Sequence, residues 1–212
     1  MSEDIVSTII DDSNIHDLVK KYTTNKSSLP EDLKNKPIGK WDVSRVTDMS
    51  YLFSRCHDFN EPLNDWNVSN VVDMVSMFSV CLIFDQPLDK WNVSHVKKMN
   101  NMFYNCTNFN QDISNWNVSH VTNMNSMFRR CKSFNQPLER WNVSHVTNME
   151  YMFSGCHIFN QPLERWNVSN VTNMEFMFSE CIDFNQPLNQ WNVSNVTNMR
   201  DMFLVCDILI SH

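Results

Sequence analysis

Three histidines recur at a fixed interval and are the residues best placed to do chemistry. His95, His120 and His145 lie 25 residues apart. In a stack of coils with that period their imidazoles would lie about 4.8 Å apart, close enough to bind a metal ion or to sense pH. The same position holds Arg45 in one repeat and asparagine in others. We therefore expect an exposed corner that holds no structural metal.

Seven cysteines follow the same interval. Equivalent Cα atoms about 4.8 Å apart would permit disulfides. However, the number is odd, the cysteines fall in an apolar stripe, and the first residues lack the basic segment and cleavage-like site of a secretory signal. We predict buried, reduced thiols in an intracellular (cytoplasmic) or virion-associated protein. The cysteines are Cys56, Cys81, Cys106, Cys131, Cys156, Cys181 and Cys206.

Composition argues against several classes of function. The chain has 2 glycines, Gly39 and Gly155, which excludes glycine-rich phosphate loops, and it has no Cys-x-x-Cys pair. A net charge of −7 argues against nucleic acid or anionic lipid as a partner. No apolar run approaches the length of a membrane span. We expect no catalytic residues, no cofactor and no membrane insertion, and an enzyme of unknown class is a remote alternative.

A 25-residue period positions all of these side chains. A fixed period of this size is typical of a solenoid, in which each repeat packs on its neighbours. We divide the chain into an N-terminal helical cap, residues 1–40, and a solenoid of seven repeats, residues 41–212. A tryptophan begins each repeat: Trp41, Trp66, Trp91, Trp116, Trp141, Trp166 and Trp191.

One repeat, residues 141–165, shows the pattern. Trp141 and Val143 alternate with polar residues and predict a short parallel strand. The 149–156 segment has apolar residues at i, i+3, i+4 and i+7, which predicts a two-turn helix that ends before Pro162. A ladder of asparagines is predicted to bond the backbone of successive turns. It consists of Asn60, Asn110, Asn135, Asn160 and Asn185, with Asp85 in one position.

The repeat unit is Trp-Asn-Val-Ser-x-Val-Thr-Asn-Met-x-x-Met-Phe-x-x-Cys-x-x-Phe-Asn-Gln-Pro-Leu. It resembles the BspA-like leucine-rich repeat of bacterial surface proteins, which also occurs in protists and large DNA viruses. The resemblance implies an α/β repeat, a right-handed leucine-rich-repeat-like solenoid whose coils each carry a short parallel strand and a short helix. It implies surface attachment and protein binding in bacteria, and it carries no catalytic residues.

The first 40 residues differ from the repeat and contain spaced apolar side chains. They predict one or two amphipathic helices. We expect these helices to cover the first coil, and a helix that docks a partner remains the alternative. The apolar residues are Ile5, Ile9, Ile10, Ile15, Leu18 and Val19.

We expect a non-enzymatic repeat protein that serves as a protein-interaction or assembly module with an unknown protein partner. The alternative is a structural component of a virus particle or surface layer. Outward positions that vary between repeats are candidates for the interaction surface, since solenoids bind partners through extended faces. The candidates are Tyr51, Tyr104, Arg129, Arg130, Tyr151, Phe176, Leu209 and Ile210.

The C-terminal end of the solenoid is a second candidate contact. The sequence predicts an uncovered core there, with Leu209 and Ile210 shielding only part of it. We expect this end to meet a partner, in the simplest case a second copy in a twofold homodimer.

Overall fold

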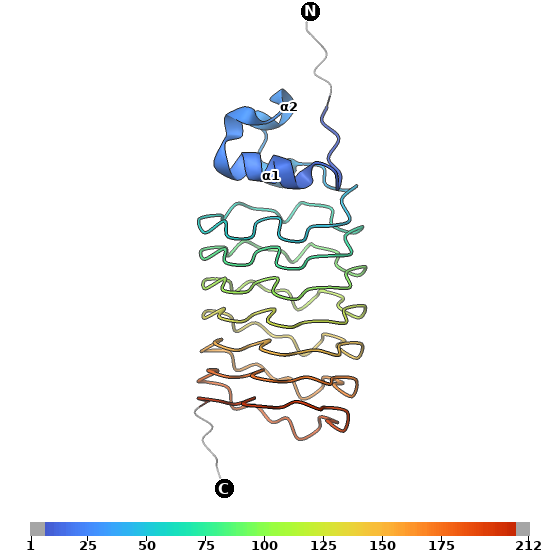
Figure 1. Ribbon diagram of the computed structural model, residues 1–212, viewed down its shortest axis with the longest axis vertical. Coiled ribbons are helices and arrows are strands. Elements are labelled where there is room, and N and C mark those ends of the chain that lie inside the picture. The colour runs from blue at the N-terminus through green and yellow to red at the C-terminus, as the bar shows by residue number, and fades with distance from the viewer. Residues whose placement is uncertain (1–6, 207–212) are drawn as a thin grey trace, which may run out of the picture.

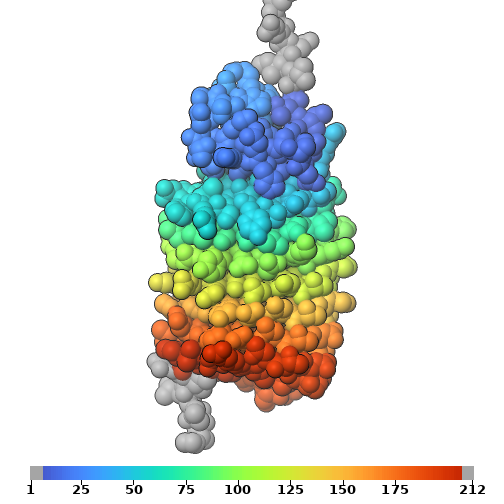
Figure 2. Space-filling model, viewed as in Figure 1, coloured from blue at the N-terminus to red at the C-terminus, as the bar shows by residue number. Residues whose placement is uncertain are grey.

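The chain from Trp41 onward winds into a rod of stacked coils, one for each 25-residue repeat (Figure 1). The computed structural model describes residues 7–206. We number the coils 1 to 7 from the tryptophan that begins each one, so coil 5 comprises residues 141–165. Figure 2 shows the coils as successive layers, with the N-terminal segment against the first of them. The predicted repeat solenoid is confirmed.

The N-terminal segment is helical. It contains α1 (Ile15–Thr24), the 3₁₀ turn η1 (Lys26–Ser28), α2 (Glu31–Lys34) and the 3₁₀ turn η2 (Ile38–Lys40). The apolar side of α1 packs into the same core as the coils, so the chain itself buries the face that could have docked a partner. Within residues 7–206 no helix is long and apolar enough to cross a membrane. The buried residues of α1 are Ile15, Leu18, Val19 and Tyr22.

Polar groups of this segment take the place of a preceding coil. The Asp12 carboxylate accepts hydrogen bonds from the backbone N–H groups of Thr47 and Asp48, at 2.7 and 3.1 Å. Nε2 of His16 donates to the carbonyl oxygen of Ser50 at 2.8 Å. These contacts satisfy part of the backbone that coil 1 exposes on this side.

The predicted strand and helix of each coil are wrong, since residues 41–206 contain only turns, bends and isolated bridges. Neighbouring coils pair at a single parallel bridge, such as Asn123 with Asn148. The 149–156 segment cannot be an α-helix, because Tyr151 has a φ of 55° and Gly155 a φ of 75°. This segment makes two successive β-turns.

The two β-turns account for the helix-like spacing of apolar residues in this segment. The N–H of Met152 donates to the carbonyl of Met149 at 3.1 Å, and the N–H of Cys156 donates to that of Phe153 at 2.8 Å. Two such turns cover the same seven-residue interval as two turns of helix and bring the same residues to one side. We call residues 149–156, and their equivalents in the other coils, the double turn.

Hydrogen bonds that all run in one direction join the double turns of neighbouring coils. The N–H groups of Tyr151 and Phe153 donate to the carbonyls of Glu175 and Met177 in the next coil, each at 2.9 Å. Two more bonds of this interface, from residues 149 and 155, follow the same pattern. The intervening N–H groups close turns within their own coil, so every N–H of this double turn has an acceptor.

Columns of identical side chains fill the interior. The rings of Trp116 and Trp141 stack with centroids 6.5 Å apart, and those of Phe128 and Phe153 stack at 5.7 Å. The indole Nε1 of Trp116 also donates to the carbonyl of Leu88, near the end of coil 2, at 3.0 Å. Each tryptophan from coil 2 onward is therefore held by a directed bond as well as by packing.

The cysteines form another interior column, and all seven are thiols. Five are buried, whereas Cys56 and Cys206 are half-buried. The thiol of Cys131 donates to the carbonyl of Phe103 in the preceding coil at 2.9 Å. Burial raises the pKa of the Cys131 thiol, so it remains neutral.

The predicted asparagine ladder is confirmed. The backbone N–H of Asn135 donates to Oδ1 of Asn110 at 2.9 Å, and the N–H of Asn160 donates to Oδ1 of Asn135 at the same distance. Each side chain thus bonds the backbone of the next coil and fixes the register of the stack.

Coil 7 is more exposed than the coils before it. Met199 is 44% exposed, whereas its equivalent Met174 is fully buried. Leu209 and Ile210, which the expected end contact includes, lie outside the described residues. The homodimer stays a prediction.

Bulky residues occupy strained backbone positions in the double turns. Val80, which is β-branched, has a φ of 63° at the position that holds Gly155 three coils later. The left-handed region costs a residue other than glycine about 1–2 kcal/mol. The inter-coil bonds impose this conformation on whichever residue stands there.

Trp116→Ala should destabilise the entire rod. Loss of a buried large aromatic costs about 3–5 kcal/mol, and it removes the donor to Leu88. Denaturant titration of the free energy of unfolding tests this, with the exposed Lys132→Ala as a control expected to cost under about 0.5 kcal/mol. Equal midpoints for the two variants would show that the tryptophan column is not core.

Val80→Gly should raise the free energy of unfolding by about 1 kcal/mol, because glycine adopts a positive φ without steric cost. Val75→Gly is the matched control, since Val75 is not among the residues with positive φ. That substitution should lower stability by roughly 0.5–1 kcal/mol. Destabilisation of similar size by both changes would contradict the assigned strain.

Candidate interaction surface

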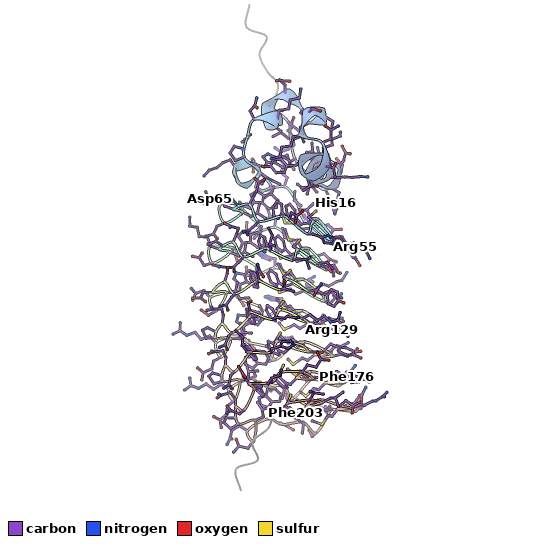
Figure 3. The ribbon with its side chains drawn as sticks, turned by 90° about the vertical axis from the view of Figure 1, so that its left-hand side faces the viewer. His16, Arg55, Asp65, Arg129, Phe176 and Phe203 are labelled. Atoms are coloured by element: carbon purple, nitrogen blue, oxygen red, sulfur yellow. The ribbon has the colours of Figure 1, made fainter. Side chains whose placement is uncertain are left out.

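The outward side chains of the double turns form one long face of the rod, which we call the double-turn face. Figure 3 shows Arg55, Arg129 and Phe176 along this side, with Asp65 on the opposite side. Equivalent residues of successive coils point in the same direction from the axis of the rod, so their side chains lie one above another. Substitutions within the repeat therefore determine the chemistry of the face.

Arginine and aromatic side chains stack on the double-turn face of coils 3 to 7. The guanidinium of Arg129 lies 4.1 Å from the ring centroid of Tyr151 and 5.9 Å from that of Tyr104. Tyr151 stacks on Phe176 at 4.8 Å with an angle of 5° between the rings, and Arg200 lies 5.8 Å from Phe176. We call these five residues the arginine–aromatic column.

The column forms at some cost to the chain. Tyr151 and Phe176 have φ values of 55° and 53°, where bulky residues are strained by about 1–2 kcal/mol. Nε of Arg129 is buried and has no hydrogen-bond partner among the described residues. Ring stacking and cation–π contact offset these costs, at about 0.5–2 kcal/mol for each contact.

The carboxylates around the column are already engaged. Glu150 accepts hydrogen bonds from Asn125 and Asn173, each at 3.2 Å. Glu175 accepts one from Asn198 at 2.9 Å and lies 3.9 Å from Arg200. Arg129 makes no salt bridge with the described residues, so its guanidinium contacts aromatic rings rather than a carboxylate.

The structure brings together only some of the residues that the sequence singled out. Tyr104, Arg129, Tyr151 and Phe176 are in contact in the column. Tyr51 is 60% exposed and stands apart in coil 1.

Two arginines lie beside these residues on the double-turn face, Arg130 and the column residue Arg200. Arg130 extends over Gly155 of the next coil, where a Cβ would lie 3.3 Å from its Cγ. Arg200 is a residue of the column that the sequence pattern did not single out. In an alignment of the repeats it lies beside Asp201, the equivalent of Phe176 in the next coil.

His95 and His120 have a structural role, whereas Nδ1 of His145 lies 3.5 Å from Oγ of the adjacent Ser144. Nδ1 of His95 and of His120 lies 2.9 Å from the serine carbonyl of the preceding coil. Where the position holds asparagine, as at Asn170, Nδ2 donates to the same carbonyl at 2.7 Å. Both side chains place a donor nitrogen at hydrogen-bond distance from this carbonyl oxygen, so either histidine or asparagine can occupy the position. Within residues 7–206 no group of three or more histidine, cysteine or acidic side chains could hold a metal ion.

A family model described as "Mycoplasma protein of unknown function, DUF285" matches residues 16–139 and 111–209. The chain therefore belongs to this family of repeat proteins. A search of curated proteins finds no match.

Two solved structures resemble the chain weakly. A leucine-rich repeat protein from Bacteroides ovatus ATCC 8483 is 13% identical with a TM-score of 0.40, and the match covers 74% of this chain and 46% of that one. The TLR13–ssRNA13 complex is 9% identical with a TM-score of 0.21, covering 73% and 33%. The chain thus spans less than half the length of either protein. Similarity at this level carries no argument about function.

His120→Asn should leave stability within about 0.5 kcal/mol, because asparagine makes the same bond to the preceding coil, whereas His120→Ala should cost about 1 kcal/mol. Denaturant titration measures both. Protein purified without chelator should contain no stoichiometric zinc or nickel by elemental analysis. A stoichiometric metal that is lost in His120→Ala would contradict the structural role.

Proposed function

We propose that the protein is a non-enzymatic interaction module that binds a protein partner through its double-turn face. The observation that carries the proposal is the arginine–aromatic column. Tyrosine and arginine are enriched among residues that dominate binding energy, because they combine large apolar contact area with directed polar groups. Here they lie on a rigid stack, so little ordering is needed on binding.

The backbone strain supports the same proposal. In coils 2, 3, 4 and 7 the position of Tyr151 and Phe176 holds a small or polar residue, namely Ser76, Asn101, Ser126 and Asp201. These residues meet the backbone requirement at lower cost, so packing within the rod does not explain aromatic rings there. Strained residues that the fold does not need commonly serve function.

The resemblance to BspA-like repeats points in the same direction, since that resemblance implies protein binding. We extend the proposal to an intracellular or virion-associated setting, in which the rod joins components of an assembly. This setting rests on the sequence pattern alone.

The test compares wild-type protein with a double variant that carries both Tyr151→Ser and Phe176→Ser. Serine stands at the same position in coils 2 and 4, so the fold should be retained, which a melting curve checks. A partner captured by wild-type protein should bind the double variant at least about tenfold more weakly.

Tyr51→Ser is the matched control, because it changes an aromatic residue at the same position of coil 1, outside the column. It should bind the partner as wild type does. Equal affinity of all three proteins would refute the assignment of the column, and failure of the wild-type protein to bind any protein from its source would refute the proposed function.

A further inference from the structure

A cavity of about 360 Å³ lies between the N-terminal segment and coil 1. The end of α1 and η1 form one wall, and residues 55–61 of coil 1 form the other. Its size is that of a small-molecule site. It lies at one end of the rod, apart from the arginine–aromatic column.

Asn60 lines this cavity, and its backbone N–H has no acceptor among residues 7–206. The equivalent N–H groups of other coils show which kind of acceptor this position uses. In coils 2 to 6 this N–H donates to a side-chain Oδ1 of the preceding coil, as Asp85 does to Asn60 at 2.9 Å. Coil 1 has no preceding coil to supply this oxygen atom, and the cavity lies on the side where such a coil would be.

A second N–H of coil 1 follows the same reasoning. Asp58 also lines the cavity, and its N–H has no acceptor within the described part of the chain. Its equivalents at Ser133 and Asp183 donate to carbonyl oxygens of the preceding coil, at 3.2 and 3.0 Å. Two neighbouring backbone donors thus face the place where a preceding coil would supply oxygen atoms.

The charged side chains around the cavity balance one another, since Lys26 and Arg55 oppose Asp58 and Glu61. Glu61 stands where coils 2 to 6 have glutamine, and its carboxylate accepts a hydrogen bond from the Tyr22 hydroxyl at 2.5 Å. Lys26 lies 3.6 Å from the same carboxylate. Contact with Tyr22, together with the charge of Glu61, raises the pKa of Lys26, so its ammonium stays protonated and balances Glu61.

Two cavity residues, Arg55 and His57, make no salt bridge with the described residues. Arg55, His57 and Asp58 are all exposed, and the Asp58 carboxylate offsets the charge of Arg55 in the sum over the lining. The cavity therefore combines the Arg55 guanidinium, the His57 imidazole and two backbone donors with two carboxylates, of which that of Glu61 is engaged by Tyr22 and Lys26.

We propose that this cavity binds the oxyanion group of a small molecule, a carboxylate or a phosphate. One oxygen takes the place of the missing Oδ1 and accepts from the N–H of Asn60, and a second accepts from Asp58. The Arg55 guanidinium supplies a charged donor to the oxyanion. Tyr151 and Phe176 lie four and five coils farther along the rod and do not line this cavity.

The test is a titration of the ¹⁵N-labelled full chain with inorganic phosphate and, separately, with citrate. Saturable shifts confined to the amides of residues 55–61 are expected with at least one of the two anions, and which anion binds identifies the oxyanion. Sodium chloride of matched ionic strength should cause no such shifts.

Arg55→Ala should weaken the binding at least about fivefold. Arg130→Ala is the matched control, because Arg130 is exposed, stands at the same position of coil 4 and has nearly the same φ, 64° against 65°. If Arg55→Ala disturbs folding, the wild-type titration alone decides. Absence of saturable shifts with both anions, or equal weakening by the two variants, would overturn the proposal.

Discussion

The fold depends on the one-directional hydrogen bonds between the double turns. A coil taken alone would leave these donors and acceptors without partners and its apolar side chains uncovered on both sides. Ordering its 25 residues costs more than its own contacts return. Each coil is therefore stable only against its neighbours, as in other repeat proteins. The bonds also require a positive φ at Tyr151 and at Gly155, so the ladder dictates backbone conformation as well as stacking.

Because the bonds share a direction, the two sides of a coil differ chemically. The side of coil 1 that faces the N-terminal segment offers double-turn carbonyls, and His16 donates to one of them. Elsewhere on that side the coil offers N–H donors, and Asp12 accepts from two of these. The substitution is incomplete. Nε1 of Trp41 is buried without a partner among the described residues, and the N–H of Asn60 has no acceptor among them.

The same constraint leaves the outward positions chemically free. Serine, asparagine, tyrosine and phenylalanine all occupy the position of Tyr151 in different coils, because the backbone bonds and not the side chain hold the turn. Stacking then brings Arg129 of coil 4 against Tyr151 of coil 5. A rigid rod with freely variable outward positions is suited to presenting a binding surface, and the arginine–aromatic column is where this chain uses that freedom.

The sequence by itself determined the period, the solenoid and the inward residues, because identical spacing of Trp116, Cys131 and their equivalents requires identical environments. It also indicated the asparagine ladder, since a polar side chain repeated in register must find a repeated partner. It could not separate a double turn from a helix, because both place residues i, i+3, i+4 and i+7 on one side. Only the tertiary structure decided that, through the competition between bonds within a coil and bonds to the next. The column and the cavity were decided in the same way, since each joins residues that only stacking brings together.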